Sequence, residues 1–347
     1  MPEQAPTGGG RFQTGIVIDT HIHTMDYLPP FASSVFRWAI RRTVPPPFFL
    51  DQLPSAGVDA VVANAVGDRV ATAWWGRTPW RSIQAQLCRI RREAEGAHIG
   101  LATSAAQVWA AFESGHMSII LGLEGGDGLG RNLSRLDKLH EWGVRLLVPV
   151  HLRDNDIGTT RLPWHSYMRI PAFPRRRSRG LTEFGYAMIE RMNSLGMIID
   201  VSHSDSTTAL DITQCTRRPI VASHTGARRI EDFERFLDDS EIIAIAETGG
   251  LLGLWPYHYG GYGPRDLDAL MRHARYIADL VGPAHLCIGT DINGVPGTLA
   301  GFRRENDIRR IAEHLRSAGF GEDDLPGIMG GNFMRVFESG RPGGRAS

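Results

Sequence analysis

Short apolar runs recur along the chain, and they are flanked by glycine or by polar residues. Runs of this length without regular polar alternation are typical of strands that are buried on both faces of a sheet. The sequence therefore predicts eight strands, at residues 16–18, 58–63, 118–124, 144–150, 197–201, 219–222, 251–254 and 286–289.

Several segments between these runs carry apolar residues at the spacing of one helical face. The clearest is 266–281, whose apolar residues follow the i, i+3, i+4, i+7 rule. Further helices are expected at 81–95, 133–142 and 182–195. Thr182 has a side chain suited to cap the last of these helices.

Strands that alternate with helices indicate a parallel sheet, and eight such units in 347 residues predict a closed (β/α)8 TIM barrel. A two-domain, doubly wound fold is the competing interpretation. It is weaker because no linker divides the chain and no Gly-x-Gly-x-x-Gly follows the first strand. We therefore expect a flexible arm at 1–14, a single barrel domain at 15–338 and a disordered tail at 339–347.

Composition and charge narrow the range of partners. The formal net charge is zero, which gives no sign of nucleic acid or a membrane surface as a partner. Three cysteines are too few for a disulfide framework, no apolar run approaches the length of a membrane span, and residues 1–10 lack the regions of a signal peptide. These features predict a cytoplasmic protein that acts on a small molecule, with a homodimer left open.

Two polar stretches show neither helical nor strand periodicity. Residues 24–47 are rich in proline and aromatic residues, and we expect them to form a loop or a packed arm at one end of the domain. Residues 153–180 include a cluster of arginines at 175, 176, 177 and 179. This second stretch is either a solvated loop or a basic lid that attracts an acidic substrate.

Side chains that can bind metal stand at the ends of six of the predicted strands. They are His21, His23, Glu124, His151, His203, His224 and Asp291. A single histidine at a strand end is more often an ordinary core or surface residue, but the carboxyl ends of parallel strands meet at one mouth of a barrel. So many imidazoles and carboxylates would be costly there without cations, so we expect two divalent metal ions.

The types of ligand indicate which metal to expect. Imidazole with carboxylate suits zinc and its neighbours in the first transition row. His21 and His23 are two residues apart, so both rings point the same way from an extended chain. Glu124 can bridge two ions, and a water held between them loses a proton near neutral pH and becomes a strong nucleophile.

These residues lie in motifs that resemble those of the membrane dipeptidase (renal dipeptidase) family of metallopeptidases, which belongs to the amidohydrolase-type barrels. The resemblance covers residues 15–337, nearly the whole chain. It rests on the segments 19–23, 124–126, 180–185, 199–203, 223–224, 288–291, 294–295 and 331–337, and on His151, Arg235 and Tyr257.

The resemblance implies a metal-dependent hydrolase with two metal sites. The first metal is held by His21, His23 and Glu124. The second is held by Glu124, His203 and His224. A hydroxide that bridges the two metals attacks the carbonyl of a dipeptide.

The resemblance also implies roles for the remaining residues. His151 hydrogen-bonds the developing oxyanion, and Asp291 carries the proton from the water to the leaving amine. Arg235 pairs with the terminal carboxylate of the substrate, a task suited to its fork geometry, and Tyr257 lies near the same pocket.

Position 23 departs from the family pattern, which has aspartate where this chain has His23. The change removes one negative charge from the ligands, so the metals should be held less tightly and the bridging water should be more acidic. Asn293 likewise stands where many relatives carry a second aspartate. A hydrolase of the same fold acting on another amide, ester or lactone is the alternative, and a non-hydrolytic binding or scaffolding barrel is the second.

Overall fold

The computed structural model describes residues 15–24, 50–72, 78–163, 166, 178–295, 297–302 and 307–340. The predicted arm at 1–14, most of the 24–47 stretch, the arginines at 175–177 and most of the tail at 339–347 lie outside these residues. The expected domain boundaries stay a prediction.

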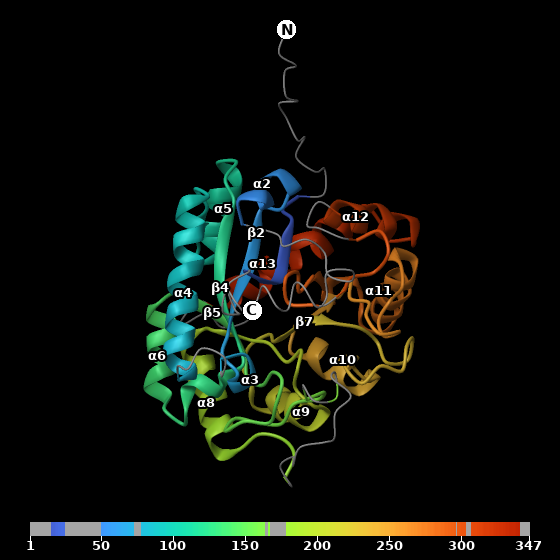
Figure 1. The fold of residues 1–347 in the computed structure, drawn as a ribbon. Coiled ribbons are helices and arrows are strands. Elements are labelled where there is room, and N and C mark those ends of the chain that lie inside the picture. Colours follow the sequence, from blue (N-terminus) through green and yellow to red (C-terminus); the bar gives the residue numbers. More distant parts are fainter. Residues whose placement is uncertain are drawn as a thin grey trace.

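Parallel strands lie at the centre of the molecule and helices surround them (Figure 1). One sheet has the order β1-β2-β4-β5-β6 with the short β3 on β4, and a second has the order β7-β8-β9. The strands are β1 (Ile18–His23), β2 (Ala60–Val66), β3 (Gly100–Leu101), β4 (Ser118–Glu124), β5 (Val144–Val148), β6 (Ile198–Ile199), β7 (Val221–Thr225), β8 (Leu251–Leu254) and β9 (Leu286–Ile288). All except β3 correspond to predicted strands.

Isolated backbone bridges join the two sheets into a closed barrel. Ile22 of β1 pairs in parallel with Ile292, which follows β9. Asp200, which follows β6, pairs in parallel with Val221 of β7, and the Val201 N–H donates to the Val221 carbonyl at 2.7 Å. The strand pairings within both sheets are parallel as well. The predicted (β/α)8 barrel is confirmed.

The first strand begins later than predicted and continues further. β1 spans Ile18–His23, so both histidines lie within the strand rather than after it. The ladder to β2 continues as far as the pair His23 and Asn64, with an irregularity between Asp19 and Ile22. Apolar composition alone misses this extension because most of the residues that it adds, such as Thr20 and His21, are polar although they are buried.

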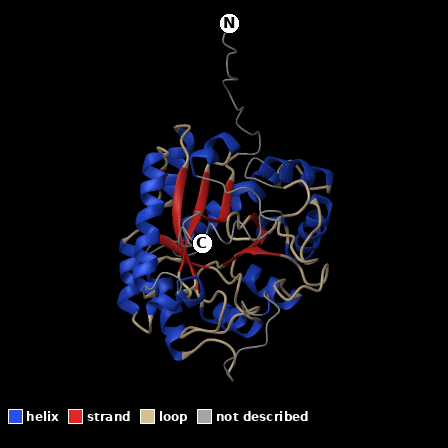
Figure 2. Ribbon diagram, viewed as in Figure 1, coloured by secondary structure: helices blue, strands red, loops and turns tan. Residues whose placement is uncertain are grey.

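Helices cover the outside of the barrel, as Figure 2 shows. Four agree with the predicted ones: α4 (Pro79–Gly96), α6 (Leu133–Glu141), α8 (Glu183–Leu195) and α11 (Leu267–Val281). Thr182 caps α8, because its hydroxyl accepts a hydrogen bond from the Gly185 N–H at 2.9 Å. The others are α2 (Leu53–Ala56), α3 (Arg69–Thr72), α5 (Ala105–Glu113), α9 (Ser206–Cys215), α10 (Asp239–Glu247), α12 (Ile308–Ser317) and α13 (Asn332–Ser339).

Successive strand residues enter two separate apolar cores. Val61 of β2 packs in the layer between the strands and the helices, whereas Val62 packs in the inner core. Phe333 and Phe337 of α13 join this inner core together with Ile16, which precedes β1. The polar side chains that could bind a metal lie instead at the carboxyl ends of the strands. No helix in the described ranges is both long and apolar enough to cross a membrane.

Candidate metal centre

The carboxylate of Glu124, at the end of β4, is surrounded by imidazoles. It is buried, and the rings around it come from the ends of four other strands or the loops that follow them. Its oxygens lie 3.0 Å from Nε2 of His23, 3.1 Å from Nε2 of His203, 3.4 Å from Nε2 of both His21 and His151, and 3.8 Å from Nε2 of His224. Side chains far apart in the sequence therefore meet around one carboxylate.

Asp291 adds a second carboxylate to this group. Its Oδ1 lies 3.4 Å from Nε2 of His23. The backbone of Asp291 has a φ of 53°, in the left-handed region that few residues other than glycine adopt. A side chain at Gly294 would collide with the Asp291 carboxylate and the His23 ring, so glycine is required there.

The donor atoms fit divalent cations. Nε2 of His21 lies 3.3 Å from Nε2 of His23, and Nε2 of His203 lies 3.0 Å from Nε2 of His224. Two ring nitrogens this close can share only one proton, whereas a cation can accept a lone pair from each. Within the described part of the chain, the buried Oε1 of Glu124 has no hydrogen-bond donor in suitable geometry. Imidazole nitrogens with carboxylate oxygens are the ligand set of zinc and related metals.

The imidazoles of His203 and His224 are neutral in the absence of metal. Burial lowers the pKa of His203 well below its usual value, and the Arg235 guanidinium lowers it further. Burial also lowers the pKa of His224, with a further contribution from His21. Neutral imidazoles have the free lone pairs that metal binding requires.

The carboxylates have the opposite effect on the first histidine pair. Burial lowers the pKa of His23, but Asp291 and Glu124 outweigh burial and raise it to about 9. Burial raises the pKa of Glu124, but the imidazoles of His151 and His21 outweigh it and hold this pKa well below its usual value. Glu124 is therefore ionised. The carboxylates of Glu124 and Asp291, which stabilise the proton on His23, would stabilise a bound cation in the same way.

Ser223 and Asp200 orient two of the imidazoles, and neither was assigned a role from the sequence. Oγ of Ser223 lies 3.1 Å from Nδ1 of His21 and 2.9 Å from Nδ1 of His224. Asp200 accepts a hydrogen bond from the Ser223 N–H at 3.1 Å. Partners of this kind direct the opposite ring nitrogen, here Nε2, toward Glu124. Their only signal in the sequence was their place in the motifs at 199–203 and 223–224.

Asp68 is a further residue that the sequence prediction missed. It follows β2, is fully buried and lies beside the ring of His151. Nothing in the local sequence distinguishes it, because its partner is distant in the chain.

Arg235 lies against the second histidine pair rather than in solvent. It is fully buried, its Nη2 is 3.1 Å from Nε2 of His203, and its Nη1 donates to the Ser202 carbonyl. Its Cζ lies 5.1 Å from the centre of the Trp255 ring, which in turn stacks on Tyr257 with ring centres 4.3 Å apart. The structure thus brings Arg235 to the metal ligands and Tyr257 next to it through Trp255, which the sequence prediction did not include.

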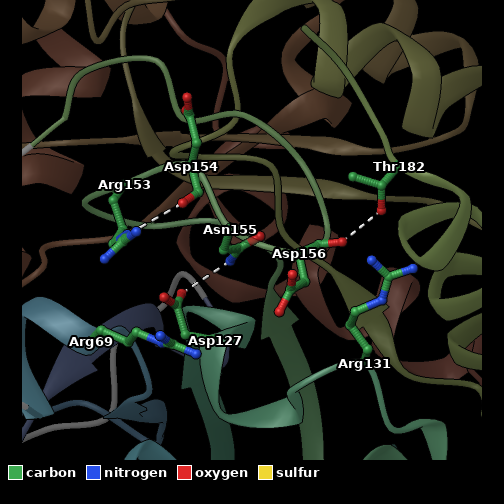
Figure 3. A pocket seen from close by; sticks show the side chains of 8 residues that line it. All are labelled: Arg69, Asp127, Arg131, Arg153, Asp154, Asn155, Asp156 and Thr182. Carbon is green, nitrogen blue, oxygen red and sulfur yellow. Dashed lines mark hydrogen bonds between the residues drawn. The ribbon is translucent and has the colours of Figure 1, made fainter. Parts of the chain in front are cut away.

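A polar cavity of about 300 Å³ lies on the same rim of the barrel (Figure 3). Asn155 and Thr182 line this cavity together with three arginines and three aspartates. These charged residues are Arg69, Arg131, Arg153, Asp127, Asp154 and Asp156. Asn155 donates to Asp127 Oδ2 at 3.0 Å, and burial with the nearby Asp68 raises the pKa of Asp127 to about 6. Arg153 is the first residue of the predicted basic lid, whose effect on a substrate stays a prediction.

Comparison with known proteins gives a family match over most of the chain. A protein-family model described as "Membrane dipeptidase (Peptidase family M19)" matches residues 52–341 of the chain. Dipeptidase aclJ of Aspergillus oryzae is 29% identical over 229 residues, which are 64% of this chain and 51% of that protein. Dipeptidase verJ of Clonostachys rogersoniana is 24% identical over 293 residues, which are 82% of this chain and 71% of that protein. The chain thus spans about half the length of the first relative.

The fold is also similar to that of solved structures. One is a metallopeptidase from Rhodobacter sphaeroides bound to a phosphinate mimic of the dipeptide L-Ala-D-Ala. The TM-score is 0.76 at 20% identity, with 94% of this chain and 99% of the other covered. A likeness at this level of identity supports the barrel fold.

Proposed function

Because the chain belongs to the membrane dipeptidase family, peptidase family M19, we propose that it is a metal-dependent dipeptidase that uses two zinc ions. The observation that carries this proposal is the convergence of His21, His23, His203 and His224 on the carboxylate of Glu124. Oε2 of Glu124 lies nearest His23, whereas Oε1 lies nearest His203 and also faces His21 and His224. Both oxygens are therefore within reach of imidazoles that could hold a metal ion, which favours a carboxylate shared by two metal sites.

The reaction then uses groups that surround Glu124. Bound divalent ions supply Lewis acidity, which polarises the scissile carbonyl and acidifies the attacking water. Asp291 accepts the proton of that water and transfers it to the leaving amine. His151 points its Nε2 toward Glu124 and donates a hydrogen bond to the oxyanion as it develops.

Arg235 selects the substrate by its free carboxylate. A guanidinium pairs with a carboxylate through two parallel hydrogen bonds, and this one is held within the site by Ser202 and Trp255. Its position next to His203 favours a short substrate, because the carboxylate and the scissile carbonyl must both be reached. This arrangement favours a dipeptide over the alternative esters and lactones, which need not carry such a carboxylate.

The test is hydrolysis of a dipeptide panel by the purified protein. Enzyme loaded with zinc should cleave L-X–L-X or L-X–D-X dipeptides, EDTA should stop the reaction, and added zinc should restore it. Elemental analysis should give two metal ions per chain. No turnover across a broad panel with two metals verified in place would overturn the dipeptidase assignment. A cytoplasmic location and a homodimer stay predictions.

A further inference from the structure

Arg161 is an almost completely buried arginine, with 4% of its side chain exposed. It lies in the 153–180 stretch, so this stretch is not solvated throughout. A buried guanidinium is costly unless its donors are satisfied. Arg161 forms an ion pair with the buried Glu241, and its guanidinium also donates to the Ser204 carbonyl at 3.2 Å and to the Phe236 carbonyl at 3.3 Å.

The two carbonyls belong to the residues that directly follow His203 and Arg235. Nε of Arg161 bonds to Ser204, and Nη1 bonds to Phe236. The backbone N–H of Arg161 also donates a hydrogen bond to the backbone carbonyl of His203 itself, at 2.9 Å. One side chain therefore links the loop that carries a metal ligand to the loop that carries the guanidinium for the substrate.

The link is anchored to the end of a helix. Glu241 lies in the first turn of α10, and its Oε2 accepts a hydrogen bond from the N–H of the N-cap residue Asp238 at 3.0 Å. The planar guanidinium has a fixed fork geometry, so bonds in several directions fix distances as well as stabilising the fold.

We propose that Arg161 is a positioning residue that sets the distance between His203 and Arg235. By setting this distance, Arg161 determines the preference of the enzyme for substrates with a free terminal carboxylate. This inference rests on the proposed dipeptidase function. The separation of the scissile carbonyl and the terminal carboxylate in a dipeptide is short, so a small displacement of Arg235 weakens the pairing in the transition state. Arg161 touches neither substrate nor metal and acts through the backbone of its neighbours.

The experiment compares a dipeptide with its C-terminal amide as substrates of the zinc-loaded enzyme. The wild type should prefer the free carboxylate in kcat/KM. Arg161→Lys keeps the positive charge but cannot form the fork, so it should reduce this preference by about tenfold or more. The reduction should come from a lower kcat/KM for the dipeptide, while kcat/KM for the amide stays the same. The metal content should remain unchanged. Arg191→Lys is the matched control, because Arg191 forms a half-exposed ion pair with Asp137 and should leave the preference unchanged.

Two further variants separate positioning from stability. Arg161→Met combined with Glu241→Met removes the buried pair without leaving a lone charge, so the thermal midpoint should recover relative to Arg161→Met alone. The preference for the carboxylate should nevertheless stay low. In an Arg235→Met background, Arg161→Lys should have no further effect on the preference, as expected for residues that act in series.

The outcomes distinguish the two proposals. Equal losses for the dipeptide and the amide, or an additive effect in the Arg235→Met background, would show a structural role and overturn the positioning inference alone. A wild type that hydrolyses both substrates equally would exclude selection of the carboxylate by Arg235, and the positioning inference with it. A wild type without dipeptidase turnover would overturn the proposed function together with this inference.

Discussion

Asp68 holds the ring of His151 through a buried contact, with Oδ2 of the carboxylate 2.7 Å from Nδ1 of the imidazole. The contact leaves Nε2 of His151 directed toward Glu124, at 3.4 Å. Burial lowers the pKa of His151, but Glu124 and Asp68 outweigh burial and raise it above its usual value. The ring is therefore held as a hydrogen-bond donor that faces the centre of the site.

We expect Asp68→Asn to lower kcat about tenfold to a hundredfold, because the ring loses the charge that orients it. KM and zinc content should change little, because His151, the ring that Asp68 orients, is assigned to the oxyanion and not to the metals or to the carboxylate of the substrate. Steady-state kinetics with elemental analysis would measure both effects. Asp232→Asn is the control, because that carboxylate is exposed and pairs with Arg228 at the surface. A kcat equal to that of the wild type in Asp68→Asn would exclude an orienting role.

Glu124→Gln and Asp291→Asn should both abolish turnover, but for different reasons. Glu124 faces both histidine pairs, so its neutral variant should lose metal as well as activity. Asp291 lies at the edge of the group and is assigned proton transfer, so Asp291→Asn should keep its metal while kcat falls at least about a hundredfold. Zinc content after gel filtration, measured beside kcat, distinguishes the two. Full zinc content in Glu124→Gln, or substantial turnover in Asp291→Asn, would contradict the assigned role.

His23→Asp tests the departure from the family pattern. The substitution adds a negative charge next to Glu124 and Asp291, and the cations should be held more tightly as a result. We expect the variant to retain zinc at chelator concentrations that strip the wild type, with activity preserved or raised. His23→Ala removes the ligand without replacing it and should lose zinc more readily than the wild type. Complete loss of metal in His23→Asp would mean that the site depends on the imidazole itself.

The strand ends could be predicted from the sequence because each combines a short apolar run with a polar side chain that is costly to bury alone. Glu124 is the clearest case, since a carboxylate that closes a run such as 118–123 needs a cation or a partner. The prediction of a barrel followed from the same runs, because parallel strands that are buried on both faces lack polar alternation.

The supporting residues could not be predicted, because their partners are distant in sequence. Arg161 looks like part of a polar loop until the fold brings it to Ser204 and Phe236. The helix α9 was missed for a different reason: it contains several β-branched residues, which favour helices weakly. It forms in part because the Asp205 side chain caps its start, accepting a hydrogen bond from the Thr208 N–H at 2.9 Å.

His273 should make the protein less stable in acid. It is buried on α11, its Nδ1 accepts a hydrogen bond from the Ala227 N–H at 3.1 Å, and its ring lies 4.9 Å from that of Phe236. Burial, together with Arg272, lowers its pKa from 6.5 to about 4. Between these two values the unfolded chain binds a proton that the folded chain does not, so stability is lost as pH falls from 6.5 toward 4. The loss is about 3 kcal/mol, at roughly 1.4 kcal/mol for each pKa unit.

His273→Gln cannot titrate, so its free energy of unfolding should fall less between pH 7 and pH 4 than that of the wild type, by about 3 kcal/mol. The variant should be less stable than the wild type at pH 7, because the ring packing is lost. Urea unfolding of both proteins without metal, across a pH series in EDTA, measures the difference and removes the contribution of metal release. His314→Gln is the control, since that ring is partly exposed and pairs with Asp268 at the surface. Identical pH dependences in the wild type and His273→Gln would show that the buried ring does not govern acid stability.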